Sequence, residues 1–172
     1  MTDLPQLRMR HELKSFAPLR SLPHGCFLRS ADEEDAEDIG IVLESAFLDP
    51  WPSSRVLEEL LENEGVPETY VVEWNGEIVG TASYQEQPNP DPSAGWLHYV
   101  GVHPNARGAA LGEILSQRVL IKAVSRGRTS VFLTTDDPRL SAIRTYLRIG
   151  FEPDFCHPSH EDRWHAVVEA LK

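Results

Sequence analysis

The sequence predicts an α/β (α+β) domain with a mixed, mostly antiparallel central sheet and helices on both faces. Three observations predict it. Apolar periodicity along the 172 residues gives the order β-α-α-β-β-β-α-β-α-β-α. Asn75-Gly76 lies between two strand-like segments and is typical of a type I′ hairpin turn, because both residues accept positive φ. The later strands are separated by helical stretches long enough for crossover connections.

The chain begins with an irregular arm, residues 1–25, in which Leu7–Leu13 is a short strand candidate. Cys26–Arg29 reads as a strand. Ser30 is expected to cap the helix that starts with the acidic run 32–35, since carboxylates stabilise a helix N-terminus. Four apolar side chains give this helix one buried face: Ile39, Val42, Leu43 and Ala46.

Pro50 and Pro52 end that helix, and Ser53 or Ser54 can cap a second one. Its apolar positions are Val56, Leu57, Leu60 and Leu61. The hairpin follows, with strands Thr69–Trp74 and Glu77–Gln85, and residues 87–95 form a loop.

The second half is expected to alternate strands with helices. Its elements are a central strand Trp96–Val102, a helix Gly108–Arg126, a strand Thr129–Thr135, a helix from Pro138 or Arg139 through Ile149, a short strand Phe151–Phe155 and a helix His160–Leu171. Gly150 suits the residue that follows a helix end.

Composition excludes several classes of protein. The net charge of −11 disfavours binding to nucleic acid phosphates. The sequence shows neither a membrane-length apolar run nor a signal-peptide core, so we expect a cytoplasmic protein without a membrane partner. Cys26 and Cys156 are interpreted as two reduced thiols, and no spacing typical of metal ligands is present.

The stretch 100–115 carries the strongest functional signal. A strand leads into Pro104, the small-residue loop Arg107-Gly108-Ala109-Ala110-Leu111-Gly112 and the start of a helix. Small residues let a ligand approach the backbone, and a helix N-terminus offers unpaired N–H groups with a partial positive charge. The stretch therefore predicts a cradle for a phosphate or pyrophosphate.

Two motifs resemble the GNAT superfamily of acetyl-CoA-dependent N-acetyltransferases. The first motif is the Val-x-Val-x-Pro end of a strand, residues 100–104, followed by the Arg107-x-x-Ala110-x-Gly112 loop. The second is the Ala-x-x-x-Tyr-x-x-x-Gly-Phe pattern of residues 142–151. The resemblance covers residues 26–155 and implies one GNAT-like domain over 1–172. It leaves the arm and the C-terminal helix, 156–172, unexplained. The family's final strand is hard to find after Phe155.

The resemblance implies acetyl-CoA as cosubstrate, with no metal. Loop amides of residues 107–112 would hold the pyrophosphate: Arg107, Gly108, Ala109, Ala110, Leu111 and Gly112. Backbone groups of Val100 and Val102 would bind pantetheine on a strand that splays from its neighbour. Ala110 replaces the family's usual glycine, which is tolerable if its φ and ψ are helical. Arg139 stands where the family often has asparagine. Its side chain either reaches a CoA phosphate or is only a solvated side chain on the surface.

Two residues are candidates for catalysis. Tyr146 is the expected general acid, because a phenol with a pKa near ~10 is protonated at neutral pH. His98 is the expected proton acceptor for the attacking amine. Strand alternation would place it on the same face as Val100 and Val102, and the resemblance to arylalkylamine acetyltransferases supports it. Asp136 and Asp137 are competing bases, with Tyr99 and Glu86 as weaker options.

The sequence is thus interpreted as an N-acetyltransferase acting on a primary amine of a small molecule or peptide by direct attack in a ternary complex. The alternatives are a non-catalytic acyl-CoA-binding or regulatory module, another acyl donor, or an oxygen nucleophile. Dimers are common in the superfamily, so a homodimer is among the expected partners, although the sequence shows no interface.

Overall fold

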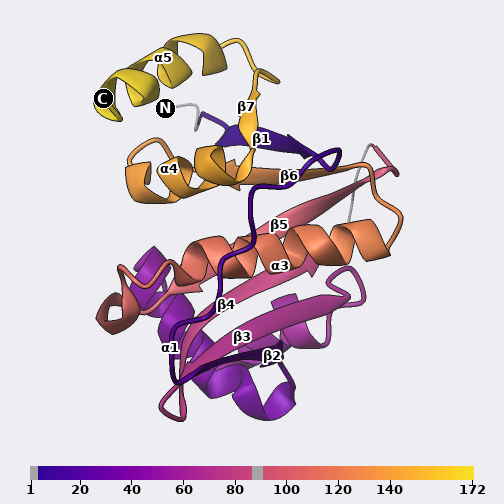
Figure 1. Cartoon of the computed structure of the whole chain (residues 1–172), viewed down its shortest axis with the longest axis vertical. Helices are drawn as coiled ribbons and strands as arrows, with labels where there is room; N and C mark the ends of the chain where they lie inside the picture. Colours follow the sequence, from indigo (N-terminus) through magenta and orange to yellow (C-terminus); the bar gives the residue numbers. More distant parts are fainter. Residues whose placement is uncertain (1–3, 87–90) are drawn as a thin grey trace.

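A mixed sheet runs through the part of the chain that this computed structural model describes, residues 4–86 and 91–172 (Figure 1). The strand order is β2-β3-β4-β5-β6-β1-β7. The strands are β1 (Leu7–Glu12), β2 (Cys26–Ser30), β3 (Glu68–Trp74), β4 (Glu77–Gln85), β5 (Ala94–Val102), β6 (Ser130–Thr135) and β7 (Glu152–Asp154). Among the described strands, β5 and β6 alone pair in parallel, and the other neighbours are antiparallel. The predicted mixed, mostly antiparallel sheet is confirmed.

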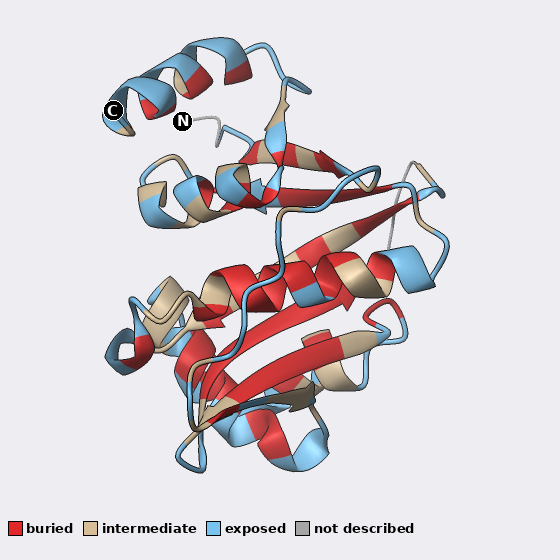
Figure 2. Cartoon of the chain, in the orientation of Figure 1, coloured by how far each residue is buried: buried red, intermediate tan, exposed pale blue. Residues whose placement is uncertain are grey.

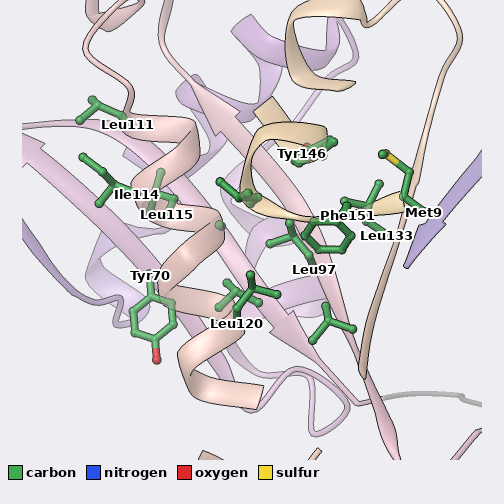
Figure 3. Close-up of a cluster of buried hydrophobic side chains, with 14 of the residues drawn as sticks. Met9, Tyr70, Leu97, Leu111, Ile114, Leu115, Leu120, Leu133, Tyr146 and Phe151 are labelled. Atoms are coloured by element: carbon green, nitrogen blue, oxygen red, sulfur yellow. The ribbon is translucent and has the colours of Figure 1, made fainter. Parts of the chain in front are cut away.

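Helices cover both faces of the sheet, as predicted. They are α1 (Ala36–Phe47), α2 (Ser53–Val56), the π-helical turn η2 (Leu57–Leu61), α3 (Leu111–Ser125), α4 (Leu140–Ile149) and α5 (His160–Ala170). One buried cluster joins α1, α2 and η2 to β3, while a larger one joins α3, α4 and α5 to the opposite face. Figure 2 shows the buried residues along the chain, and Figure 3 shows part of the larger cluster. Within the described ranges, no helix has the length and apolar character needed to cross a membrane.

The N-terminal strand β1 lies inside the sheet, between β6 and β7. It pairs antiparallel with all of β6, from Leu7↔Thr135 to Glu12↔Ser130. Leu7 and Met9 are fully buried and alternate with less buried residues, so one face of β1 enters the core. The resemblance implied a final strand, for which the sequence after Phe155 has no clear signal. Strand β1, from the N-terminal arm, is therefore its counterpart in the sheet.

Several element boundaries differ from the predictions. Ser30 ends β2 and caps no helix. The cap is Asp32, at the start of the 3-10 turn η1 (Glu33–Asp35) that leads into α1, and its side chain accepts a hydrogen bond from Glu34 N at 3.0 Å. Neither Ser53 nor Ser54 caps α2, whose N-cap is Pro52. β5 begins at Ala94, inside the expected loop, of which residues 87–90 lie outside the described residues.

Candidate active site

The sheet opens between β5 and β6. The two strands pair only from Ala94↔Ser130 to Trp96↔Phe132. Beyond that point β5 continues to Val102 and β6 to Thr135 without pairing to each other. Backbone groups of β5 on the side of β6 are therefore free for a ligand, which is the splayed geometry that we expected at Val100 and Val102.

A β-bulge in β5 changes which side chains face which helix. Thr81 pairs with Gly101 and Ser83 pairs with His98, so Ala82 alone opposes both Tyr99 and Val100. Tyr99 has a φ of +46°. The extra residue interrupts the side-chain alternation of the strand.

His98 consequently lies on the α1 face, opposite to Val100 and Val102. Gly101 faces α1, because a Cβ there would meet Leu43 Cδ2 at 3.2 Å. His98 shares that face, because their partners on β4, Ser83 and Thr81, are two residues apart. Val100 and Val102 pack with the cluster on the α3 face. Our prediction that alternation puts His98 on their face is wrong, since it assumed an unbroken strand.

Two cavities flank the opening. The α3-side cavity measures about 750 Å³ and the α1-side cavity about 280 Å³. Three residues line both cavities: Val100, Arg139 and Tyr146. A reaction between molecules held in the two cavities would therefore take place beside these three residues.

The predicted loop forms the wall of the α3-side cavity, except that the Ala109 side chain packs against the core. No described acceptor receives the backbone N–H groups of residues 108–113, and the first such bond of α3 is from Ile114 N to Ala110 O. A Cβ added at Gly108 would have nothing within 4 Å, and one at Gly112 only Val102 at 3.7 Å. Six consecutive free donors beside open space fit a pyrophosphate.

Ala110 departs from the condition under which we expected alanine to be tolerated. Its φ of 57° and ψ of 21° are left-handed, and it is the N-cap of α3. The helix therefore begins at Leu111, three residues later than predicted. A residue with a Cβ is strained in this conformation, so glycine is the better residue here.

Tyr146 lies at the junction of the cavities. It is 8% exposed, and burial raises the pKa of its phenol to about 12. Among the described residues its hydroxyl has no hydrogen-bond partner. The phenol is therefore protonated at neutral pH and available to a ligand.

His98 lines the α1-side cavity, with its ring centroid 3.9 Å from that of Tyr99. Burial lowers its pKa to about 4, against the opposing charge of Glu59. The imidazole is therefore neutral at pH 7, and its unprotonated nitrogen can accept a hydrogen bond from a ligand.

The two competing bases, Asp136 and Asp137, differ in whether they line a cavity. Asp136 lines the α1-side cavity and accepts a hydrogen bond from Gln6 Nε2 at 2.9 Å. Asp137 lines neither cavity, and Arg163 Nε donates to its carboxylate at 2.9 Å. That guanidinium lowers the pKa of Asp137, so Asp137 is held as an ion pair outside both cavities and is a poor candidate for the base.

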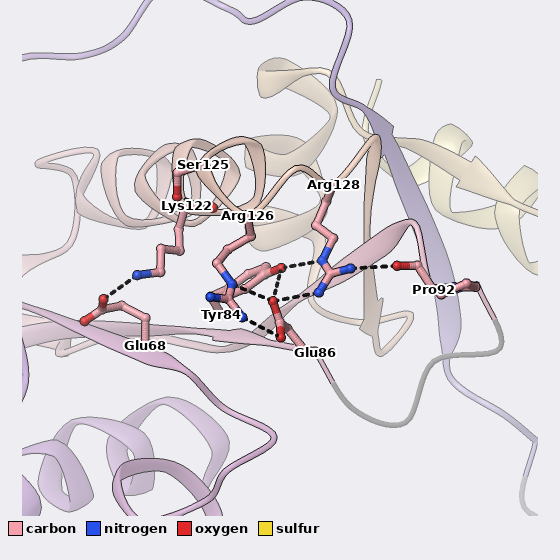
Figure 4. Close-up of polar contacts among 8 residues, drawn as sticks. All are labelled: Glu68, Tyr84, Glu86, Pro92, Lys122, Ser125, Arg126 and Arg128. Atoms are coloured by element: carbon pink, nitrogen blue, oxygen red, sulfur yellow. Dashed lines mark hydrogen bonds and ion pairs between the residues drawn. The ribbon is translucent and has the colours of Figure 1, made fainter.

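Glu86 is also removed from the opening. Its carboxylate accepts hydrogen bonds from Arg126 and Tyr84 and pairs with Arg128 at the far end of β4 (Figure 4). These partners, Arg126 first, hold its pKa to about 2. Tyr99 lines the α1-side cavity, but its hydroxyl donates to Glu59 Oε2 at 3.0 Å.

Arg139 stands between the cavities and is the N-cap of α4. Its guanidinium carbon lies 4.2 Å from the centre of the Phe47 ring. No carboxylate of the described residues forms an ion pair with it. Arg139 is thus a free cation facing both cavities.

Sequence reasoning missed the residues that the N-terminal segment brings to the opening. Arg20 lines the α3-side cavity, together with Glu113 and Arg148. Gln6 lines the α1-side cavity, together with Trp51. No local pattern marks them, because their neighbours in space are distant in the sequence.

The two cysteines lie away from the opening. Cys26 and Cys156 are free thiols, and neither lines the two cavities. In residues 4–86 and 91–172, no three His, Cys, Asp or Glu side chains come together as metal ligands.

Comparison with known proteins agrees with this geometry. The profile described as "Acetyltransferase (GNAT) family" matches residues 20–151. A mycothiol acetyltransferase of Thermobispora bispora is 32% identical over 154 residues, which cover 84% of this chain and 52% of the relative. The chain thus spans about half the length of this curated relative.

Solved structures show the same fold. A GCN5-related N-acetyltransferase from Sphaerobacter thermophilus superposes with a TM-score of 0.68 at 26% identity, over 88% of this chain and 50% of that one. A ribosomal-protein-alanine N-acetyltransferase from Brucella melitensis gives 0.64 at 22% identity, over 78% and 96%. With a profile match across most of its length, the chain belongs to the GNAT family of acetyltransferases.

Proposed function

We propose that this chain is an N-acetyltransferase that moves an acetyl group from acetyl-CoA to a primary amine of a small molecule or peptide, in a ternary complex. The observation that carries the proposal is the meeting of two cavities at Val100, Arg139 and Tyr146, through the gap between β5 and β6. The 32% identity to a named mycothiol acetyltransferase supports acetyl as the transferred group.

Acetyl-CoA would occupy the α3-side cavity. Its pyrophosphate suits the free N–H groups of residues 108–113, and Arg107 lies in the same wall. Its pantetheine amides suit the open backbone edge at Val100 and Val102. Arg139, a free cation near the junction, would neutralise charge that develops there. When bound, acetyl-CoA supplies a reactive acyl group and a thiolate leaving group.

The acceptor amine would occupy the α1-side cavity, whose volume of about 280 Å³ suits a small amine or one peptide residue. His98, neutral at pH 7, would take a proton from the amine nitrogen, directly or through water. Tyr146 would give its phenolic proton to the departing sulfur. Asp136 is the competing base on the same cavity. Positioning of acetyl-CoA and the amine next to each other would supply much of the rate acceleration.

The test is an amine panel with acetyl-CoA, read by thiol release and by mass of the product. Tyr146→Phe should lower kcat roughly 10²-fold or more, while Tyr70→Phe, another buried tyrosine outside both cavities, should leave it unchanged. His98→Gln should likewise lower kcat, while His165→Gln, on the exposed side of α5, should leave kcat unchanged. Binding of acetyl-CoA without acetylation of any amine would refute the proposal and favour a non-catalytic acyl-CoA-binding module.

A further inference from the structure

The segment between β1 and β2, residues 13–25, is held against α3, and we refer to it as the strap (Figure 1). Gln117 of α3, only 3% exposed, holds it at two points. Its Nε2 donates to Pro18 O at 3.0 Å, and its Oε1 accepts from Arg20 N at 3.1 Å. The backbone of Arg20 is therefore placed at one fixed position along α3.

The Arg20 side chain meets a second arginine at a buried carboxylate. Glu113 is 4% exposed. Its Oε1 lies 2.8 Å from Arg20 Nε, and its Oε2 accepts from Arg148 Nη1 at 3.1 Å. The strap and α4 thus each bring one guanidinium to the start of α3.

Both guanidinium groups keep donors that no described acceptor uses. These are the two terminal amino groups of Arg20, and the Nε and Nη2 of Arg148. Both side chains line the α3-side cavity, and they are 48% and 51% exposed. Two cations around one carboxylate leave a net charge of +1 facing the cavity. Fork-shaped guanidinium donors match the oxygens of a phosphate group.

This cluster differs from the cradle at residues 108–113. The cradle offers backbone N–H groups, which suit the singly charged units of a pyrophosphate. The arginine pair offers charged donors in a half-exposed setting, which suits the higher charge of a terminal phosphate monoester. Coenzyme A carries one such group, on the 3′ oxygen of its ribose.

We propose that Arg20 and Arg148 form the binding site for the 3′-phosphate of coenzyme A, and that the strap supplies half of this site. The proposal rests on the proposed function, because it assumes a CoA thioester in the α3-side cavity. Glu113 orients both arginines and does not itself contact the phosphate.

Titration calorimetry with CoA and 3′-dephospho-CoA, at one fixed ionic strength, tests the proposal. The intact protein should bind CoA at least ~10-fold more tightly, since hydrogen bonds between charged groups are the strong ones. Arg20→Gln and Arg148→Gln should each remove most of that ratio while leaving the affinity for 3′-dephospho-CoA within about 2-fold.

Matched controls come from the same segments. Lys14→Gln removes a cation from the strap, and its side chain is 84% exposed. Arg144→Gln removes one from α4, where its Nη2 donates to Leu171 O at 3.0 Å. Neither residue lines the cavity, so both variants should keep the full ratio. Melting temperatures establish that all four variants are folded.

Equal affinity of the intact protein for the two nucleotides would overturn this proposal and leave the proposed function standing. The proposal would also fall if Arg20→Gln weakened both nucleotides by the same factor, because the effect would then be a general one of charge. Binding of neither nucleotide would refute the proposed function, and this inference with it.

Discussion

Replacement of Ala110 by glycine should stabilise the protein. Ala110 has a φ of 57°, and a residue with a Cβ costs ~1 to 2 kcal/mol in the left-handed region. Glycine removes that cost but gives the unfolded chain more freedom, which returns roughly 0.5 to 1 kcal/mol. The net gain is about 0.5 to 1 kcal/mol, or roughly 1 to 4 °C in Tm for a chain of this size.

The neighbouring residue provides the control. Ala109 belongs to the same loop but is absent from the residues with positive φ. Ala109→Gly therefore gains flexibility without relief of strain, and should lose about 0.5 to 1 kcal/mol. Urea unfolding of the two variants in parallel should separate them by ~1 to 2 kcal/mol, a difference less sensitive to errors of extrapolation than either value.

The same variant tests the loop as a ligand site. Glycine at position 110 keeps the backbone path and removes a methyl group from the cavity wall. Affinity for acetyl-CoA should stay equal or rise. A lower Tm for Ala110→Gly than for Ala109→Gly would refute the left-handed conformation. A clear loss of acetyl-CoA affinity would refute the placement of the loop.

Three further predictions concern charge and packing. Glu86, whose pKa is held to about 2 from a usual 4.5 mainly by Arg126, contributes stability above about pH 4.5 that is lost as the pH falls to about 2. Glu86→Gln should therefore cost roughly 2 kcal/mol in urea unfolding at neutral pH and nothing measurable near pH 2. His98, with its pKa lowered to about 4, should stay unprotonated down to about that pH, so its titration should not appear in kcat/KM near pH 6.5. An acid limb of kcat/KM near pH 6.5 that vanishes in His98→Gln would contradict this. Gly40→Ala places a Cβ 2.3 Å from the carbonyl oxygen of Trp51. It should cost ~2 to 3 kcal/mol and raise KM for the amine more than KM for acetyl-CoA.

Local signals were sufficient where the physics is local. Asn75-Gly76 predicted the hairpin turn, and both residues have positive φ, 54° and 85°. The small-residue loop predicted free donors before a helix, and residues 108–113 provide them. The resemblance that the two motifs carry, and not local physics, implied a strand that separates from its neighbour, which β5 does after Trp96. The roles of Tyr146 and His98, a cytoplasmic location and a homodimer stay predictions.

Other features could not be read from the sequence, because they depend on partners far along the chain. The bulge at Tyr99 exists only relative to the register of β4, and nothing local marks it. Alternation counted along β5 alone therefore placed His98 on the wrong face. The left-handed conformation of Ala110 likewise depends on how α3 is oriented against the sheet. Alanine as a residue type disfavours that conformation, so the sequence did not predict it.

The sequence by itself determined which elements form and where the loop with free backbone N–H groups lies, since hydrophobic periodicity, turn residues and small-residue loops act through neighbouring residues. Only the tertiary structure decided which side chains surround that loop. Strand β1 pairs with β6 across more than a hundred residues, as in Leu7↔Thr135, and that pairing sets where the strap begins. Arg20 in the strap then contacts Gln117 of α3, which lies 97 residues later in the sequence. Such contacts follow from burying β1 in the sheet, which no local propensity specifies.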